Sequence, residues 1–240
     1  AIGPRRLAPF DLVLSYTGGG ALTALTERLG ARRVAPLYGS VDPERYQPAT
    51  PPSEPRAALS YLGTYAADRQ DAVDGLLLEP ARQRSDLRFV VGGAQYPQDF
   101  AWTDNIFFWR HVAPVDHPRF YAAARATLNV TRRAMAASGW CPSGRLFEAA
   151  ACAAPVVSDW WDGLDAFFVP EREILIVRTT KDVLAALDRS DAEIDRIGEA
   201  AHARVLADHT AGRRADELIA LLSNPYGATP SRYPAAPMEA

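Results

Sequence analysis

The sequence predicts an α/β fold in which a parallel sheet carries helices on both faces, the doubly wound arrangement. Three observations lead to this prediction. Short apolar runs rich in Val, Leu and Ile alternate with stretches of helical periodicity along most of the 240 residues. Glycine and proline mark the turns between these segments. Hydrophobic residues make up 48% of the chain, which is enough to bury both faces of such a sheet.

The chain begins with a partial β-α-β unit, which suits a parallel pair of strands. Its segments are a strand at 10–16, a glycine turn at 17–20, a helix at 21–30 that stops at a glycine, and a strand at 32–39. Residues 40–55 contain five prolines and show no apolar periodicity, which is typical of a linker. We therefore expect a partial N-terminal α/β unit at 1–42 and a linker at 43–57.

A longer α/β domain is expected over 58–222, followed by a Pro- and Ala-rich tail at 223–240. Its expected strands are 58–62, 87–93, 105–112, 126–131, 155–159 and 173–179. Its expected helices are 68–83, 117–125, 143–154, 181–188 and a helix or helix pair over 191–222. Ligands of such sheets bind beyond the carboxyl ends of the strands. The candidate site loops are therefore 16–20, 63–66, 92–98, 112–117, 130–145 and 158–164.

Composition disfavours several classes of protein. The net charge is −3 without a basic block, which argues against a nucleic-acid partner. The two cysteines form neither a disulfide scaffold nor a CxxC pair, so we expect a reducing, cytoplasmic location. The four histidines match no zinc pattern, and we predict no metal. We also expect no transmembrane segment and no signal peptide. Because the first residue is Ala1, we expect a trimmed chain.

The stretch from Pro142 to Glu148 carries the strongest candidate site. Pro142 fits the first turn of a helix, which leaves the amides of Ser143 and Gly144 free to bind an anion such as phosphate. Arg145 can add a bidentate bond to phosphate. Glu148 lies about one turn later, and a carboxylate can accept both hydrogens of a vicinal diol such as ribose. The alternative stays open that Glu148 is an ordinary helix residue and Arg145 a surface cation.

The stretch RLFEAAACAAPVVSD (145–159) resembles the second half of the E-x7-E signature of retaining glycosyltransferases with the GT-B fold. Further stretches resemble a narrower group, the spore-maturation CgeB-like glycosyltransferases. These stretches are SYLGTYAADRQ (60–70), HVAPVDHPRFYAAARATLNVTR (111–132), GWCPSGRLFEAAACAAPVVSDWWDGLDAFF (139–168), EILIVRTTKDVL (173–184) and ADHTAGRRADEL (207–218). The resemblance covers nearly all of residues 58–220.

The resemblance implies two Rossmann-like domains around a cleft, with the C-terminal domain binding a nucleoside-diphosphate sugar as co-substrate and no other cofactor. It places Glu148 on the ribose, and Ser143 and Gly144 beside the diphosphate. Further donor-binding candidates are Gly63, Thr64, Tyr65, Arg69, Arg132, Arg145, Asp159 and Gly163. The stretch from Asp159 to Gly163 falls where related enzymes contact the donor sugar. His111 is a candidate on different grounds, because it ends a strand and could face the cleft, although a histidine at a strand end is more often structural. No catalytic residue follows from the resemblance.

Three departures from the pattern matter. Trp140 stands where the first glutamate of E-x7-E would contact the sugar. Ala153 or Ala154 replaces the usual glycine. Residues 10–40 match only the last β-α-β piece of an acceptor domain. The resemblance thus makes residues 1–42 the remnant of an N-terminal Rossmann-like domain, and we expect the rest of that domain in a longer parent protein.

Several other residues allow a functional and a structural interpretation. A dehydrogenase-type dinucleotide loop at 17–20 is disfavoured because GxGxxG is absent. Trp160 and Trp161 could stack on a sugar or pack internally, and Tyr96, Phe100 and Trp102 suit packing. His117 suits a helix start. His202 and His209 share a helix face and suit packing or solvent contact, and Cys152 suits a small buried position.

The sequence thus favours a glycosyltransferase donor-domain fragment that transfers a sugar from a nucleotide-sugar donor to an unknown acceptor. A non-catalytic nucleotide-sugar-binding or assembly module is the main alternative. A different nucleotide enzyme of the same fold, such as a sugar-nucleotide epimerase, is a further one.

Overall fold

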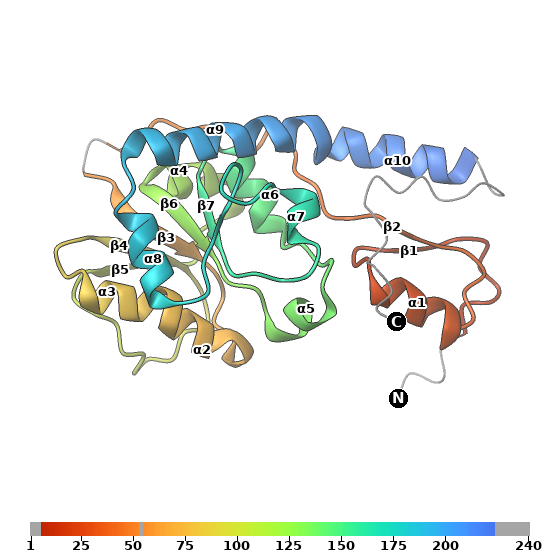
Figure 1. The fold of residues 1–240 in the computed structure, drawn as a ribbon, viewed down its shortest axis with the longest axis horizontal. Coiled ribbons are helices and arrows are strands. Elements are labelled where there is room, and N and C mark those ends of the chain that lie inside the picture. The colour runs from red at the N-terminus through yellow and green to blue at the C-terminus, as the bar shows by residue number, and fades with distance from the viewer. Residues whose placement is uncertain (1–5, 53–54, 224–240) are drawn as a thin grey trace.

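The computed structural model describes residues 6–52 and 55–223, and its main body is a six-stranded parallel sheet between two layers of helices (Figure 1). The strand order is β5-β4-β3-β6-β7-β8, and every neighbouring pair is parallel. The strands are β3 (Ala57–Leu62), β4 (Phe89–Gly93), β5 (Ile106–Arg110), β6 (Ala124–Asn129), β7 (Val156–Ser158) and β8 (Leu175–Ile176). This architecture confirms the predicted doubly wound α/β fold.

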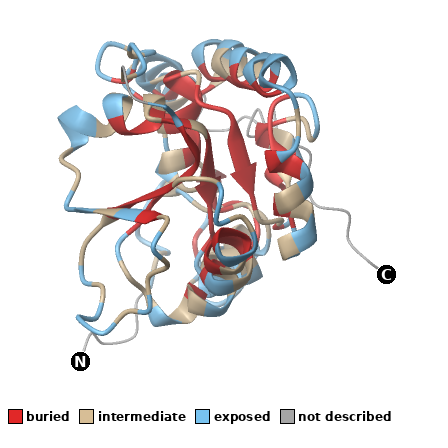
Figure 2. Ribbon diagram, turned by 90° about the vertical axis from the view of Figure 1, so that its left-hand side faces the viewer, coloured by how far each residue is buried: buried red, intermediate tan, exposed pale blue. Residues whose placement is uncertain are grey.

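The helices cover the sheet in two groups. One group packs around the apolar side chains of residues 73–81 and includes α2 (Gln70–Val73), α3 (Glu79–Gln83) and α8 (Thr180–Leu187). The other group includes α4 (His117–Ala122), α6 (Gly144–Ala151) and much of α9 (Asp191–Asp208). Figure 2 shows that the sheet between them is buried. All six residues of β3 are buried, as expected for the central strand of a parallel sheet.

A smaller unit lies beside this body. β1 (Val13–Ser15) and β2 (Val34–Pro36) form a two-stranded parallel sheet, connected by α1 (Gly20–Glu27). No residue of α1 is fully buried. α10 (Ala211–Ser223) continues from α9 toward this unit (Figure 1).

The junction between the two bodies depends on Arg214, which is buried. Its guanidinium donates hydrogen bonds to the carbonyls of Tyr38 and Gly39, at 3.1 and 3.3 Å. Val41 exchanges backbone hydrogen bonds with His209 and Ala211. These bonds fix the segment after β2 against the break between α9 and α10.

Two of the expected helices differ clearly from the observed ones. The helix expected at 68–83 begins with a 3-10 turn (Ala67–Arg69) and is divided by a π-turn (Asp74–Leu78). The π-turn precedes Pro80, which has no N–H to continue a regular helix. The helix expected at 117–125 ends at Ala122, because Ala124 already pairs with β3. The expected pair over 191–222 is confirmed, with its break at His209 and Thr210.

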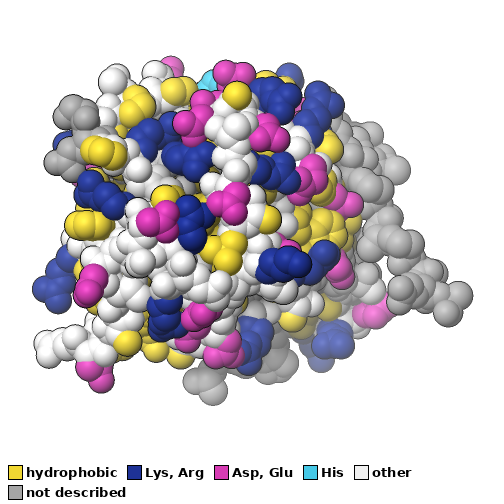
Figure 3. Space-filling model, turned by 60° about the vertical axis from the view of Figure 1, so that its left-hand side comes forward, with side chains coloured by type: hydrophobic (Ala, Val, Ile, Leu, Met, Phe, Trp, Pro, Cys, Tyr) yellow, Lys and Arg dark blue, Asp and Glu magenta, His cyan; other side chains and the backbone are white. Residues whose placement is uncertain are grey.

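Two short helices were not expected, α5 (Arg133–Ser138) and α7 (Leu164–Phe167). The tail predicted from 224 onward lies outside the described residues. Within 6–52 and 55–223, no helix is both long and apolar enough to cross a membrane. On the face seen in Figure 3, side chains of both charges are interspersed.

Candidate functional site

The strand order reverses between β3 and β6, and a cavity opens where these two strands end. In an open α/β sheet this reversal is where ligands bind. The cavity has a volume of about 270 Å³. It is lined by Thr64, Tyr65, Ala66, Arg69, Gln95, Val130, Thr131, Arg132, Met135, Ser143 and Arg145. Six of the predicted residues therefore meet here.

The start of α6 forms one wall of the cavity. Ser143 is its N-cap, and the serine hydroxyl accepts a hydrogen bond from the amide of Arg145 at 3.4 Å. Gly144 is exposed, so the backbone can be approached closely there. The Arg145 side chain is partly buried and has no ion-pair or hydrogen-bond partner among the described residues. A helix start and an uncommitted cation thus face the same space, which favours an anion.

Arg69 ties together the two loops that frame the cavity. This buried guanidinium donates to the carbonyl of Val130 at 3.3 Å and to the carbonyl of Thr64. A Cβ on Gly63 would lie 2.9 Å from the arginine's Nη2, so a side chain there would displace it. Arg69 therefore adds positive charge while fixing the loop after β3.

Arg132 is the third arginine of the cavity, and it is exposed. Its Nε lies 3.4 Å from a carboxylate oxygen of Asp68. More than half of the Arg132 side chain is exposed to solvent, so this ion pair is weak and can exchange partners.

Asp159, predicted to contact the donor sugar, follows β7 and supports the cavity from behind. Its carboxylate accepts hydrogen bonds from the amide of Thr131 at 3.0 Å and from the Thr131 hydroxyl at 2.8 Å. Burial raises the pKa of Asp159, against the opposing effect of these hydrogen bonds. Asp159 does not itself line the cavity. Its hydrogen bonds fix the position of Thr131, which does line the cavity.

Glu148 lies one turn into α6, outside the cavity lining, and it joins residues from two other segments. His117 Nδ1 lies 3.2 Å from Glu148 Oε2. The Tyr46 hydroxyl also lies close to this carboxylate, and burial followed by the charge of Glu148 raises the pKa of Tyr46 to about 12. Oε1 lies on the side of Gly144, 3.9 Å from where a Cβ would stand on that glycine.

Trp140 lies between the two bodies of the chain. Its carbonyl accepts a hydrogen bond from the amide of Gly18 at 2.9 Å. Its ring leaves no room for side chains at Gly19 or Gly163, where a Cβ would stand 2.5 and 2.4 Å from ring atoms. The predicted sugar-contact residue Gly163 therefore packs on Trp140 at the start of α7. The glycine turn at 17–20 packs on the same ring.

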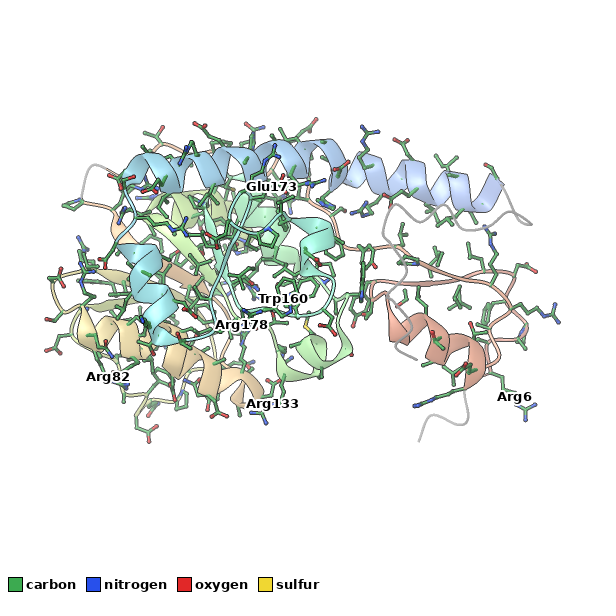
Figure 4. All side chains as sticks on the ribbon, viewed as in Figure 1. Arg6, Arg82, Arg133, Trp160, Glu173 and Arg178 are labelled. Carbon is green, nitrogen blue, oxygen red and sulfur yellow. The ribbon has the colours of Figure 1, made fainter. Side chains whose placement is uncertain are left out.

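The remaining predicted residues lie further out. His111 is exposed at the end of β5, with a positive φ of 60°, and does not line the cavity. Trp161 is buried, whereas Trp160 is partly exposed and lies beside Arg178, whose guanidinium carbon is 5.9 Å from the ring centroid (Figure 4). The cluster of Tyr96, Phe100 and Trp102 is internal packing, as predicted.

The histidine and cysteine interpretations are partly confirmed. His117 is the first residue of α4, and Cys152 is buried. His202 bonds to the carbonyl of Ala151 at 2.9 Å. His209 does not share the helical face of His202, because α9 ends at Asp208 and the His209 ring is buried.

Sequence reasoning did not single out Gln95, Thr131 or Met135 in the cavity, although it did indicate their loops. It also missed the contacts of Tyr46 and His117 with Glu148. Tyr46 and Glu148 are far apart in the chain, and no local pattern links them. Among the residues that the structure describes, no group of three or more His, Cys, Asp or Glu side chains is placed to hold a metal ion.

Solved structures share this fold at low sequence identity. Sucrose-phosphate synthase from Thermosynechococcus elongatus matches with a TM-score of 0.70 at 17% identity, over 91% of this chain and 59% of its own. Anabaena Alr3699/HepE, in complex with UDP and glucose, matches with a TM-score of 0.70 at 15% identity, over 90% of this chain and 64% of its own. TarM matches with a TM-score of 0.66 at 10% identity, over 92% of this chain and 44% of its own.

The chain thus spans less than two thirds of the length of these structures. A comparison with curated proteins gives no match. The model of one protein family, described as glycosyl transferase-like, matches residues 69–220, well over half of the chain. The chain therefore belongs to the glycosyl transferase-like family and has the Rossmann-like architecture of GT-B glycosyltransferases.

Proposed function

We propose that the cavity between β3 and β6 binds the diphosphate of a nucleoside-diphosphate sugar, and that the chain is the donor-binding part of a glycosyltransferase. The observation that carries this proposal is the meeting of Arg69, Arg132 and Arg145 with the start of α6 around one cavity. Of the three, Arg145 has no partner of its own in the described structure, so its charge is available to a ligand.

The arginines also suggest what the site would do chemically. In transfer, the bond between the sugar's anomeric carbon and the diphosphate oxygen breaks, the acceptor oxygen bonds to that carbon, and the acceptor loses its proton. The departing diphosphate gains negative charge, which fixed cations and helix amides stabilise. We propose that these groups take the place of a metal ion. The structure of Anabaena Alr3699/HepE with UDP-glucose supports a nucleotide-sugar donor.

We further propose that Glu148 accepts the ribose hydroxyls and that the chain falls in the CgeB-like group. The first proposal is supported by Glu148 Oε1, which lies beside Gly144 next to the cavity wall. The second is supported by the run of residues 139–168. We also propose that residues 1–42 belong to a separate acceptor domain and 58–222 to the donor domain. The separate two-stranded sheet at β1 and β2 supports this division.

Calorimetric titration with UDP-, GDP- and ADP-sugars tests the donor proposal. We expect one of them to bind, and we expect Arg145→Ala to weaken binding by about tenfold or more through loss of a charge-assisted contact. Arg133→Ala is the matched control, since Arg133 is exposed and pairs with Asp71 away from the cavity lining. A folded chain that binds none of these donors refutes the proposal.

A non-catalytic nucleotide-sugar-binding or assembly module is the second candidate, and Trp140 favours it. This ring fills the space between Gly19 and Gly163 at the position where the resembling enzymes carry a carboxylate. Product analysis with a UDP-sugar separates the candidates. Sugar release or transfer that is lost in Glu148→Ala excludes the binding module, and formation of an isomeric nucleotide sugar indicates an epimerase.

A further inference from the structure

The carboxylate of Glu148 is held by two residues from separate parts of the chain. His117 begins α4, and Tyr46 belongs to the segment that connects the small β1–β2 unit to the main body. A carboxylate only accepts hydrogen bonds, so His117 Nδ1 must donate to it, and the Tyr46 hydroxyl lies close enough to Glu148 for the two groups to interact. The His117 contact measures 3.2 Å, with only 14% of the histidine side chain and 23% of the glutamate side chain exposed.

The ring of His117 is itself fixed by packing. It packs against the rings of Tyr46 and Tyr121, with centroid distances of 6.1 and 6.2 Å. Tyr121 is buried, and its hydroxyl has no hydrogen-bond partner within the described structure. His117 and Tyr46 therefore both border the carboxylate of Glu148, and the ring of His117 has little freedom to move. The other oxygen of this carboxylate, Oε1, is directed toward Gly144.

We propose that His117 and Tyr46 are positioning residues that orient Glu148 so that its carboxylate can accept the ribose hydroxyls of a bound nucleotide. This inference rests on the proposed function. Holding a side chain in its binding geometry before the ligand arrives lowers the entropic cost of binding. Because Tyr46 comes from the connecting segment, the packing of that segment also affects the affinity for ribose.

The test compares two ligands that differ only at the ribose. The probe is whichever of UDP, GDP or ADP the chain binds, titrated by calorimetry beside its 2′,3′-dideoxy analogue. For the unaltered chain we expect the analogue to bind about tenfold or more weakly, because hydrogen bonds to a charged group are lost. Glu148→Ala should bring the ratio of the two dissociation constants close to one.

His117→Ala and Tyr46→Phe should each reduce that ratio several-fold. His117→Asn should restore most of it, because its amide nitrogen takes the place of Nδ1. Tyr121→Phe is the matched control for Tyr46→Phe, since it removes a hydroxyl without a partner, and it should leave the ratio unchanged. Circular dichroism identifies variants that do not fold. Because His117 and Tyr46 are varied separately, the test still gives a result if one of the two variants fails to fold.

The outcomes separate the inference from the function on which it rests. If Glu148→Ala removes the discrimination while His117→Ala and Tyr46→Phe retain it, the positioning role is wrong and Glu148 remains the ribose ligand. If Glu148→Ala retains the discrimination, the ribose role of Glu148 is wrong, and the inference falls with it. If no nucleotide binds, the donor proposal itself is wrong.

Discussion

Acidification should weaken the fold through His209, at the junction of the two bodies. The ring is buried, Nε2 lies 3.4 Å from the carbonyl of Phe167, and Nδ1 lies 2.9 Å from Nη2 of Arg214. Because arginine only donates, Nδ1 must be an acceptor and the ring must be neutral. Burial, with the charge of Arg214 second, lowers the pKa of His209 from 6.5 to about 4.

The sign and the size of the effect follow from this shift. Between pH 6.5 and about 4 the unfolded chain binds a proton at His209 that the folded chain does not, so the stability that the neutral ring contributes is lost as the pH falls through that window. At pH 5 the loss amounts to about 2 kcal/mol relative to pH 7.5. At pH 5 most carboxylates are still ionised, so this contribution is not masked by them.

Urea unfolding of the unaltered chain and of His209→Gln at both pH values measures this contribution. Glutamine can accept from Arg214 and donate to the carbonyl of Phe167, but it does not titrate. We expect the unaltered chain to lose about 2 kcal/mol more than the variant between pH 7.5 and pH 5. Equal losses in the two proteins would refute the assignment of a buried neutral ring.

Other predictions concern close packing and thiol chemistry. Gly163→Ala should lower the free energy of unfolding by about 3 kcal/mol in denaturant titrations, because φ is 89° and the new Cβ would stand 2.4 Å from the Trp140 ring; an unchanged midpoint would contradict this packing. Gly198→Ala should cost about 1–3 kcal/mol, since its Cβ would meet a backbone oxygen at 2.4 Å. Gly75→Ala, with open space around it, should instead stabilise the chain by about 0.5–1 kcal/mol, and the same titration compares the two. Burial raises the pKa of the Cys152 thiol to about 12, so it should react with a thiol reagent only in denaturant, and rapid labelling of the native chain would show that the thiol is accessible.

Much of the fold could be predicted because it depends on local pattern. The run ending at Gly93 is apolar on both faces, as a buried parallel strand must be, and it forms β4. The start of α6 was predicted to within two residues: Pro142 was expected in the first turn, but it precedes Ser143, which is the N-cap. The loops around the cavity followed from the rule that ligands bind at strand ends.

The parts that could not be predicted depend on contacts between distant residues. The alanines after Tyr121 suit a helix, yet Ala124 begins β6. Pairing with β3 stabilises this segment more than the helix propensity of alanine would. Tyr46 could not be assigned to Glu148 from spacing. Trp140 could be recognised as a departure from a pattern, but its packing against Gly19 and Gly163 is visible only in three dimensions.

A crystal structure of the chain with the nucleoside diphosphate that binds it best tests the central claim most directly. We predict the diphosphate at the start of α6, within hydrogen-bonding distance of Arg145, with the ribose hydroxyls at the carboxylate of Glu148. A nucleotide bound elsewhere, for example in the groove lined by Phe107 and Trp109, with the cavity between β3 and β6 empty, would contradict the account.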